Sequence, residues 1–211
     1  MKAADLLVAC LEEEGIEYIF GVPGEENADF MLSLAESKKI RFILTRHEQG
    51  AAFMAEVYGR LTGNPAGCLG TLGPGASNLI TGVANANMDR VPMLVLTGQG
   101  STSRLHKESH QIMDVVGMFE PVTKWAISIR HPSTIPEIVR KAVRLSRMEK
   151  PGAVHIELPE DIAKEDADER AMLPRRFFRS QPTPAVISQA FELLMRARKP
   201  VILAGNGCIR G

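Results

Sequence analysis

Several features that would place this sequence in a common functional class are absent. Its 25 Lys and Arg residues balance its 25 Asp and Glu residues, so no net charge attracts nucleic acid or an anionic membrane surface. Aromatic residues make up only 5% of the chain and are not interleaved with basic ones. No apolar run approaches the roughly 20 residues that a membrane-spanning helix needs. We therefore expect neither a nucleic-acid partner nor a membrane partner.

Cysteine is also scarce. The three cysteines, Cys10, Cys68 and Cys208, lie far apart and form no CxxC pair, which is typical of small core residues in a reducing compartment. The five histidines lack zinc-site spacing, so no metal ligand is predicted. The N-terminal stretch MKAADLLVACLEEEG is interpreted as an amphipathic helix closed by Gly15 rather than a signal peptide. A cytoplasmic location follows as the expectation.

Two phosphate-binding signatures are missing or incomplete. No glycine run is followed by GK[ST], which excludes a P-loop, and TGQGSTS lacks the third glycine of GxGxxG. The pattern therefore gives only weak evidence for a dinucleotide.

Helical and extended patterns alternate along most of the chain. Helices are predicted at 3–14, 27–37, 47–62, 74–88 and 133–149, and strands at 18–21, 41–45, 66–72, 92–98, 125–130 and 153–158. The stretch 100–120 fits neither pattern. Strands separated by helices predict an α/β fold, a three-layer parallel sheet with helices on both faces.

The composition changes after Pro159. We predict an α/β domain over residues 1–165 and a charged, proline-containing linker over residues 166–184. A further helix is expected at 185–197, and KPVILAGNGCIRG has the pattern of a strand that runs into glycines. Such a strand normally begins a new βα unit. Residues 185–211 are therefore interpreted as the truncated start of a second, Rossmann-like domain.

Ligands of open α/β sheets bind beyond the carboxyl ends of the strands. Four predicted strand ends carry unusual residues, in the stretches FGVPGEEN, TRHEQG, TLGPGASN and TGQGSTSR. Each alone is weak evidence, because glycine turns after strands are often only geometry. Glu48 alone is best explained as a first-turn acid favoured by the helix dipole. His47 and His110 alone would most often be structural histidines.

Taken in order, these stretches resemble a known family. IFGVPGEEN, TRHEQGAAFMAEVYGRLTG, GPGASNLITGVANANMDRVPMLVLTGQ and HQIMDVVGMFEPVTKW resemble the N-terminal, pyrimidine-binding domain of thiamin-diphosphate-dependent decarboxylases and carboligases, most of all acetolactate synthase large (catalytic) subunits. PGAVHIELPEDIA resembles the end of that domain, and KPVILAGNGCIRG the opening of the family's central domain. The resemblance implies the thiamin-diphosphate-binding fold and a transferase that decarboxylates pyruvate and joins the two-carbon unit to a second 2-oxo acid.

The resemblance makes Glu48 the activating acid of the coenzyme. In the family this carboxyl hydrogen-bonds a ring nitrogen of the aminopyrimidine and favours the imino tautomer, which can take the proton from the thiazolium carbon. The residues that follow, Ala51, Ala52, Phe53 and Met54, predict that the carboxyl is partly buried. The apolar residues of the helix would then keep the carboxyl at its start partly out of water, where it hydrogen-bonds the pyrimidine ring.

The resemblance also assigns further site residues. Gln111 matches a catalytic glutamine close to the reacting centre, and His110 beside it is either a proton-transfer group or the donor of a structural hydrogen bond. Where the family usually has Phe-Gln-Glu this chain has His-Gln-Ile, which leaves the biosynthetic or catabolic subclass open. The residues expected to bind the coenzyme, besides Glu48, are Val22, Pro23, Gly24, Gly73, Pro74 and Asn78.

Part of the family's site is not in this sequence. The family binds Mg²⁺ and the diphosphate through a GDG motif in a third, C-terminal domain, and this chain contains no GDG. We therefore expect the 211 residues alone to be catalytically inert. The resemblance implies a homodimer or tetramer formed through the pyrimidine domain. FAD in the central domain and a regulatory small subunit are left open.

Other functions compete with this interpretation. Another thiamin-diphosphate 2-oxo-acid decarboxylase or carboligase, of the glyoxylate carboligase or benzoylformate decarboxylase type, would need the same acid. A nucleotide-binding or structural α/β module would make Glu48 an ordinary helix-start residue. A non-catalytic dimerising module could use the small-residue faces at 51–55 and 79–86, although these faces suit an ordinary core equally well.

Overall fold

The computed structural model describes residues 1–174 and 181–210. Contacts between residues divide the chain into two units, Met1–Arg175 and Arg176–Gly211, and each is described by itself. None of the helices in the described residues is long and apolar enough to cross a membrane. The predicted linker, 166–184, lies partly outside the described residues, so the domain boundaries at 165 and 184 stay predictions.

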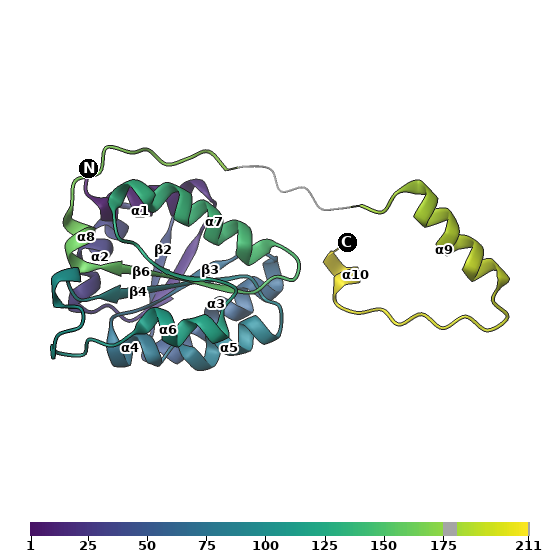
Figure 1. The fold of residues 1–211 in the computed structure, drawn as a ribbon, viewed down its shortest axis with the longest axis horizontal. Coiled ribbons are helices and arrows are strands. Elements are labelled where there is room, and N and C mark those ends of the chain that lie inside the picture. The colour runs from purple at the N-terminus through teal and green to yellow at the C-terminus, as the bar shows by residue number, and fades with distance from the viewer. Residues whose placement is uncertain (175–180, 211) are drawn as a thin grey trace. The chain divides into compact units, whose positions relative to one another are not determined.

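A six-stranded sheet forms the centre of the first unit (Figure 1). Its strands are β1 (Tyr18–Gly21), β2 (Arg41–Leu44), β3 (Ala66–Gly70), β4 (Met93–Gln99), β5 (Ala126–Ser128) and β6 (Ala153–Pro159). They lie in the order β2-β1-β3-β4-β6-β5, and every neighbouring pair is parallel. The predicted α/β fold is confirmed, and all six predicted strands form with small shifts at their ends.

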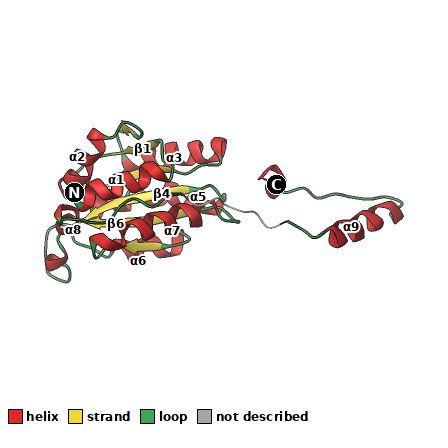
Figure 2. Cartoon of the chain, turned by 90° about the horizontal axis from the view of Figure 1, so that it is seen from above, coloured by secondary structure: helices red, strands yellow, loops and turns green. Residues whose placement is uncertain are grey.

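Helices cover both faces of the sheet, so that the yellow strands of Figure 2 lie between red helices. One face carries α1 (Ala3–Glu13), α2 (Ala28–Glu36), α7 (Ile135–Arg147) and α8 (Glu160–Lys164), and the other carries α3 (Glu48–Thr62), α4 (Gly73–Ser77), α5 (Ile80–Met88) and α6 (Val115–Phe119). Single turns of 3₁₀ helix, η1 (Glu25–Asn27), η2 (Thr102–Arg104), η3 (Glu120–Val122) and η4 (Pro132–Thr134), complete the unit. Neighbouring strand residues alternate between the two faces: Ile19 packs into one core cluster and Phe20 into the other.

The prediction of a single helix over 74–88 is wrong. α4 ends at Ser77 and α5 begins at Ile80, because the Leu79 N–H donates to the Ala76 carbonyl, three residues back, at 3.1 Å. A hydrogen bond over three residues tightens the turn and separates the two helices. The break follows Asn78, whose side chain belongs to the site described below.

Small residues pack α3 against α5 inside the first unit. The residues of these two faces that are fully buried are Ala51, Ala52, Ala55, Leu79, Val83 and Ala86. A Cβ added to Gly82 would lie 2.6 Å from the Ala52 Cβ, so the two helices touch closely at this point. The small residues of these two faces therefore belong to the core of the unit, as the alternative interpretation expected, and a dimer interface through this unit stays a prediction.

The second unit contains two helices, α9 (Pro184–Arg196), as predicted, and the short α10 (Gly207–Arg210). The prediction of a strand in KPVILAG is wrong, because residues 197–206 form no strand. Val201, Ile202 and Leu203 are 93%, 77% and 99% exposed. A strand needs a neighbour to pair its N–H and C=O groups, and the described residues of this unit supply no such neighbour. Cys208 is exposed as well, so the prediction of core cysteines holds for Cys10 and Cys68 only.

Candidate functional site

The carboxyl ends of the strands gather the predicted site residues. All six strands are parallel, so their carboxyl ends lie at one edge of the sheet. The neighbouring strands β2, β1, β3 and β4 lead there into the start of α3, residues 22–24, α4 and the segment 100–113. Residues from four distant parts of the sequence thus meet at this edge.

Glu48 is the first residue of α3 and is only 8% exposed. His47 caps the helix, since its Nδ1 accepts a hydrogen bond of 3.1 Å from the Gln49 N–H, which confirms a structural histidine here. Glu48 Oε2 accepts a hydrogen bond of 3.0 Å from Asn78 Nδ2. In the described ranges, 1–174 and 181–210, no group donates to Oε1, which lies 3.4 Å from the position of a Cβ on Gly75. One oxygen is held, and the other is free for a donor on a ligand.

The cover of Glu48 differs from the prediction. Partial burial of the carboxyl is confirmed, but Phe53 and Met54 are 37% and 43% exposed and are not what buries it. On a helix, a residue five or six positions along points to another face than the first residue. The close neighbours of the carboxylate are instead Gly75 and Asn78, from α4 and its end.

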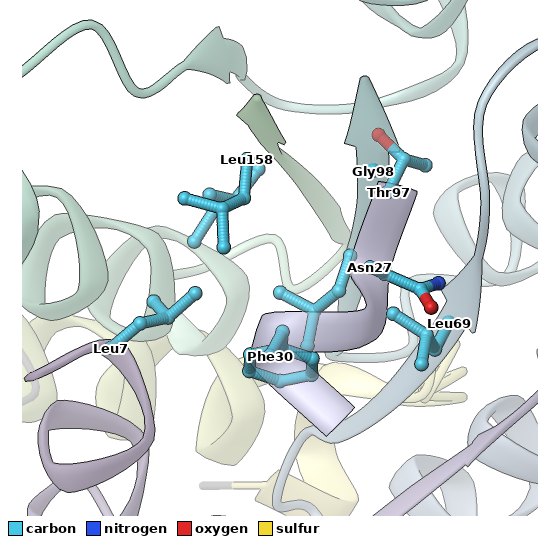
Figure 3. A pocket seen from close by; sticks show the side chains of 9 residues that line it. Leu7, Asn27, Phe30, Leu69, Thr97, Gly98 and Leu158 are labelled. Atoms are coloured by element: carbon cyan, nitrogen blue, oxygen red, sulfur yellow. The ribbon is translucent and has the colours of Figure 1, made fainter. Parts of the chain in front are cut away.

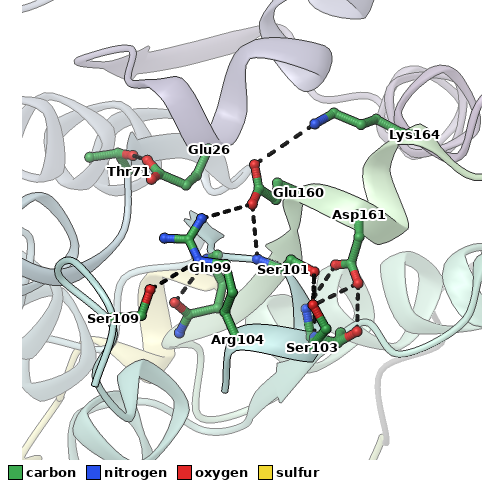
Figure 4. A network of polar contacts seen from close by, with 12 residues as sticks. Glu26, Thr71, Gln99, Ser101, Ser103, Arg104, Ser109, Glu160, Asp161 and Lys164 are labelled. Atoms are coloured by element: carbon green, nitrogen blue, oxygen red, sulfur yellow. Dashed lines mark hydrogen bonds and ion pairs between the residues drawn. The ribbon is translucent and has the colours of Figure 1, made fainter. Parts of the chain in front are cut away.

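Thr71 joins the two glycine loops of the site. A Cβ on Gly24 would lie 2.5 Å from both Cβ and Oγ1 of Thr71, a distance at which no side chain fits. On the other side, Thr71 Cγ2 lies 2.7 Å from the position of a Cβ on Gly75. Thr71 Oγ1 donates a hydrogen bond of 3.0 Å to Glu26 Oε2 (Figure 4). Sequence reasoning missed Thr71 and Glu26, although Thr71 is the first residue after a buried strand.

The loop with Val22, Pro23 and Gly24 is fastened to the end of β3. Buried Asn27 accepts a hydrogen bond from the Gly24 N–H at 2.9 Å and donates one to the Gly70 carbonyl at 3.4 Å. The Val22 N–H donates to the Leu69 carbonyl at 3.3 Å. Val22 and Gly24 are half-buried and Pro23 is exposed. The backbone of this loop is thus held in place by hydrogen bonds to Asn27 and to the end of β3.

Gly73 and Gln111 lie against each other. Gly73 has φ +50°, and a Cβ there would lie 2.6 Å from the Gln111 carbonyl oxygen, so only glycine satisfies both demands. Gln111 has φ +56°, which is uncommon for a residue with a side chain. Gln111, Pro74 and His110 are exposed, and the His110 side chain makes no hydrogen bond within the part of the chain that the structure describes. The structural hydrogen bond considered for His110 is therefore not found.

A buried polar pair lies beside this edge, at the ends of β4 and β6. Gln99 is 2% and Glu157 is 4% exposed, and Gln99 Nε2 donates to Glu157 Oε2 at 3.0 Å and to the Met113 carbonyl at 3.1 Å. Burial raises the pKa of Glu157, while hydrogen bonds from Ser128 and Gln99 oppose that shift. The pair anchors both ends of the segment that carries Gln111. A glutamate inside the apolar run AVHIEL was the signal for it.

A small cavity lies between this edge and α1 (Figure 3). It is lined mainly by apolar side chains, among them Leu7, Phe30, Leu69, Leu96 and Leu158, and its volume is about 10 Å³. A space of this size holds about one water molecule. The cavity is therefore a packing gap and not a site for an organic ligand.

The residues at the edge fit an aminopyrimidine ring. A buried carboxylate with one unpartnered oxygen can accept a hydrogen bond from a protonated ring nitrogen, and the Gly24 and Gly73 loops beside it are fixed by close contacts with Thr71 and Gln111. Within residues 1–174 and 181–210, no three His, Cys, Asp or Glu side chains are grouped so that they could hold a metal ion. Fold and edge together are those of an α/β domain whose candidate ligand site lies at the carboxyl ends of its strands.

Residues 1–118 match the family model described as "Thiamine pyrophosphate enzyme, N-terminal TPP binding domain". Because the match covers more than half of the chain, the chain belongs to this family, whose coenzyme is thiamine pyrophosphate, also called thiamin diphosphate. The family resemblance drawn from the sequence motifs is thus confirmed.

Named relatives agree with the family. Glyoxylate carboligase of Escherichia coli O157:H7 is 39% identical, over 99% of this chain and 36% of its own length. A probable acetolactate synthase large subunit of Methanocaldococcus jannaschii is 38% identical, over 99% of this chain and 36% of its own length. Acetolactate synthase 2, chloroplastic, of Nicotiana tabacum is 37% identical, over 98% of this chain and 32% of its own length. The chain spans about a third of the length of the curated relatives it matches.

Proposed function

We propose that the chain is the pyrimidine-binding part of a thiamin-diphosphate-dependent transferase of the acetolactate synthase type. Such an enzyme decarboxylates pyruvate and joins the two-carbon unit to a second 2-oxo acid. The observation that carries the proposal is the carboxylate of Glu48, buried at the carboxyl edge with one oxygen held by Asn78 and the other unpartnered. Relatives named acetolactate synthase support the choice of reaction.

The described residues have separate tasks in this proposal. When bound, thiamin diphosphate supplies a thiazolium carbon that becomes a nucleophile once it loses its proton. Glu48 offers Oε1 to the pyrimidine ring nitrogen and so holds a proton there, while Asn78 fixes the orientation of the carboxylate. The loop at Val22–Gly24, fastened by Asn27, and the loop at Gly73 are the backbone segments that we assign to the faces of the ring. Gln111 lies against Gly73, and we assign it to the side of the reacting centre.

Glyoxylate carboligation is the second candidate. The glyoxylate carboligase of Escherichia coli O157:H7 is as similar to the chain, at 39% identity, as the acetolactate synthases are. Both reactions need the same proton-holding acid, so Glu48 does not discriminate between them. Substrate selection in the family rests largely on a domain beyond this chain.

The test uses the complete enzyme with thiamin diphosphate and Mg²⁺, given pyruvate or glyoxylate. Glu48→Gln keeps the size of the side chain but removes the charge, and we expect it to lower kcat by about 10²–10⁴-fold. Glu56→Gln is the matched control, because Glu56 is a 3% exposed acid on the same helix that pairs with Arg60 and Asn85. We expect it to keep turnover. Full turnover in Glu48→Gln would contradict the proposal, and turnover of glyoxylate alone would favour the second candidate.

We further propose that the 211 residues alone are inert, since their sequence has no GDG motif for the metal and diphosphate. The chain is mixed with thiamin diphosphate, Mg²⁺ and pyruvate, and no acetolactate is expected. Turnover that disappears in Glu48→Gln would show that this part of the proposal is wrong.

The assembly we propose is a homodimer or tetramer formed through this unit. Its support is an apolar stripe on α3: Phe53, Val57 and Leu61 are spaced by four residues, share one face, and are 37%, 51% and 80% exposed. The opposite face of α3 is buried in the core. A contiguous apolar stripe in water is typical of an interface, and a second copy of the enzyme is the partner we propose for it.

A further inference from the structure

The segment between β4 and α6 carries Gln111 but has little regular structure. Apart from η2, residues 100–114 form turns, bends and irregular loop, and His106, Lys107, Glu108 and His110 are exposed. Segments of this kind sample many conformations unless other parts of the fold hold them. In this structure the first turn of α8 does so (Figure 4).

Two acids at the start of α8 hold the beginning of the segment. Glu160 Oε1 accepts a hydrogen bond of 3.1 Å from the Ser101 N–H. Asp161 accepts from both the N–H of Thr102, at 3.0 Å, and its hydroxyl, at 2.5 Å. These contacts fix residues 101 and 102 and leave the part near Gln111 to be held by something else.

Arg104 connects Glu160 to the part of the segment near Gln111. Its Nη1 donates to Glu160 Oε1 at 3.1 Å, and its Nε donates to Ser109 Oγ at 3.1 Å. A guanidinium can donate in both directions because its N–H groups form a rigid fork, which an ammonium group does not offer. One side chain thus links α8 to a residue two positions before Gln111.

The end of the segment, at Ile112, is held by a backbone hydrogen bond and by close packing against Gly100. The Ile112 N–H donates to the Ser109 carbonyl at 3.3 Å, and Ile112 Cδ1 lies 2.5 Å from the position of a Cβ on Gly100. Gln111 between them has φ +56° and its carbonyl touches Gly73. A residue with a side chain keeps this conformation only where its surroundings impose it.

We propose that Arg104 is a positioning residue: its bridge between Glu160 and Ser109 fixes residues 105–111 so that Gln111 lies against Gly73. The inference rests on the proposed function, in which Gln111 lies near the reacting centre. The competing explanation is an ordinary surface ion pair, since Arg104 and Glu160 side chains are 36% and 22% exposed. Such pairs contribute little, so the two explanations predict different results.

The test uses the complete enzyme and two readouts: hydrogen–deuterium exchange of a peptide covering residues 105–113, and kcat with KM. Ser109→Ala removes only the acceptor of the Arg104 Nε, and Ser109→Thr restores a hydroxyl. Arg104→Lys keeps the charge beside Glu160 but loses the fork. Lys164→Ala is the matched control, because it removes the other cation near Glu160, at 3.8 Å, without touching Arg104.

We expect hydrogen–deuterium exchange of residues 105–111 to be about tenfold faster in Arg104→Lys and in Ser109→Ala than in the parent. We expect kcat to fall by a similar factor and KM to change less. Ser109→Thr should recover most of both readouts, and Lys164→Ala should match the parent. Because one bridge is removed either way, the double variant Arg104→Lys/Ser109→Ala should be no worse than the poorer single variant.

Two results would overturn the proposal. One is exchange in Arg104→Lys and Ser109→Ala equal to that in Lys164→Ala; the other is faster exchange with the kcat of the parent. Gln111→Ala and Glu48→Gln are measured in parallel. If both keep full turnover, the proposed function is wrong and the positioning role falls with it. If both lose turnover while the Arg104 and Ser109 variants keep it, only the positioning role is wrong.

Discussion

His155 makes the stability of the first unit depend on pH. It lies in the middle of β6, fully buried, with its ring stacked on Phe119 at a centroid distance of 4.3 Å. Its Nε2 and Thr97 Oγ1 are 2.8 Å apart, whereas Nδ1 has no hydrogen-bond partner among the described residues. Burial lowers the pKa of His155 from 6.5 to about 3, because a charged ring would lose its hydration without gaining a counter-charge.

The size of the effect follows from the two pKa values. Between pH 6.5 and about 3 the unfolded chain binds a proton at this position and the folded chain does not, so stability falls as the pH falls. At about 1.4 kcal/mol per pH unit, the loss relative to neutral pH is about 2 kcal/mol at pH 5 and about 3 kcal/mol at pH 4.

The assay is urea unfolding of the chain and of His155→Gln at pH 7, 5 and 4. The variant is expected to be less stable at pH 7, because it loses the stacked ring, but to lose about 2 kcal/mol less than the parent between pH 7 and pH 5. His106→Asn is the control: it removes an exposed histidine whose φ of +64° asparagine tolerates. The reasoning is refuted if parent and His155→Gln lose stability in parallel on acidification.

Three further predictions concern the site and the surface. Gly73→Ala should lower the free energy of unfolding by about 1–3 kcal/mol, because φ is +50° and the Gln111 carbonyl oxygen is 2.6 Å from the added Cβ; an unchanged urea midpoint would contradict this. Asn78→Ala removes the donor to Glu48 and should raise the Kd of thiamin diphosphate in the complete enzyme about tenfold by calorimetry, whereas an equal Kd would show that this hydrogen bond does not orient the acid. Val57→Lys should weaken self-association of the complete enzyme in sedimentation experiments, and Leu32→Lys, which changes a 67% exposed leucine on α2, should not; equal effects of the two would remove the support for an α3 interface.

The sheet could be predicted because its strands are short apolar runs between turn residues. β4 and β6 are buried along their whole length, as runs such as PMLVLTG and AVHIEL indicate. The break between α4 and α5 could not be predicted, since it consists of one hydrogen bond over three residues rather than four. The strand expected near Val201 fails for the opposite reason: its pattern is present, but no described neighbour pairs with it.

The site could be predicted in outline only. Glu48 and the glycine loops follow strands directly, and in a parallel sheet such residues lie at the same edge whatever the strand order is. Thr71 beside Glu26, and Arg104 beside Glu160, are contacts between residues far apart in the sequence. Such contacts depend on which strands are neighbours, β1 with β3 and β4 with β6, and periodicity does not determine that order. Polar side chains that act by holding another residue in place therefore could not be predicted from the sequence.

The most direct test of the account is a crystal structure of the complete enzyme with thiamin diphosphate bound, read at Glu48 Oε1. We predict a ring nitrogen of the aminopyrimidine within hydrogen-bond distance of this atom, about 2.6–3.2 Å, with Asn78 still donating to Oε2. A coenzyme ring bound elsewhere, or a Glu48 side chain turned away from it, would contradict the assignment of this edge as the pyrimidine site.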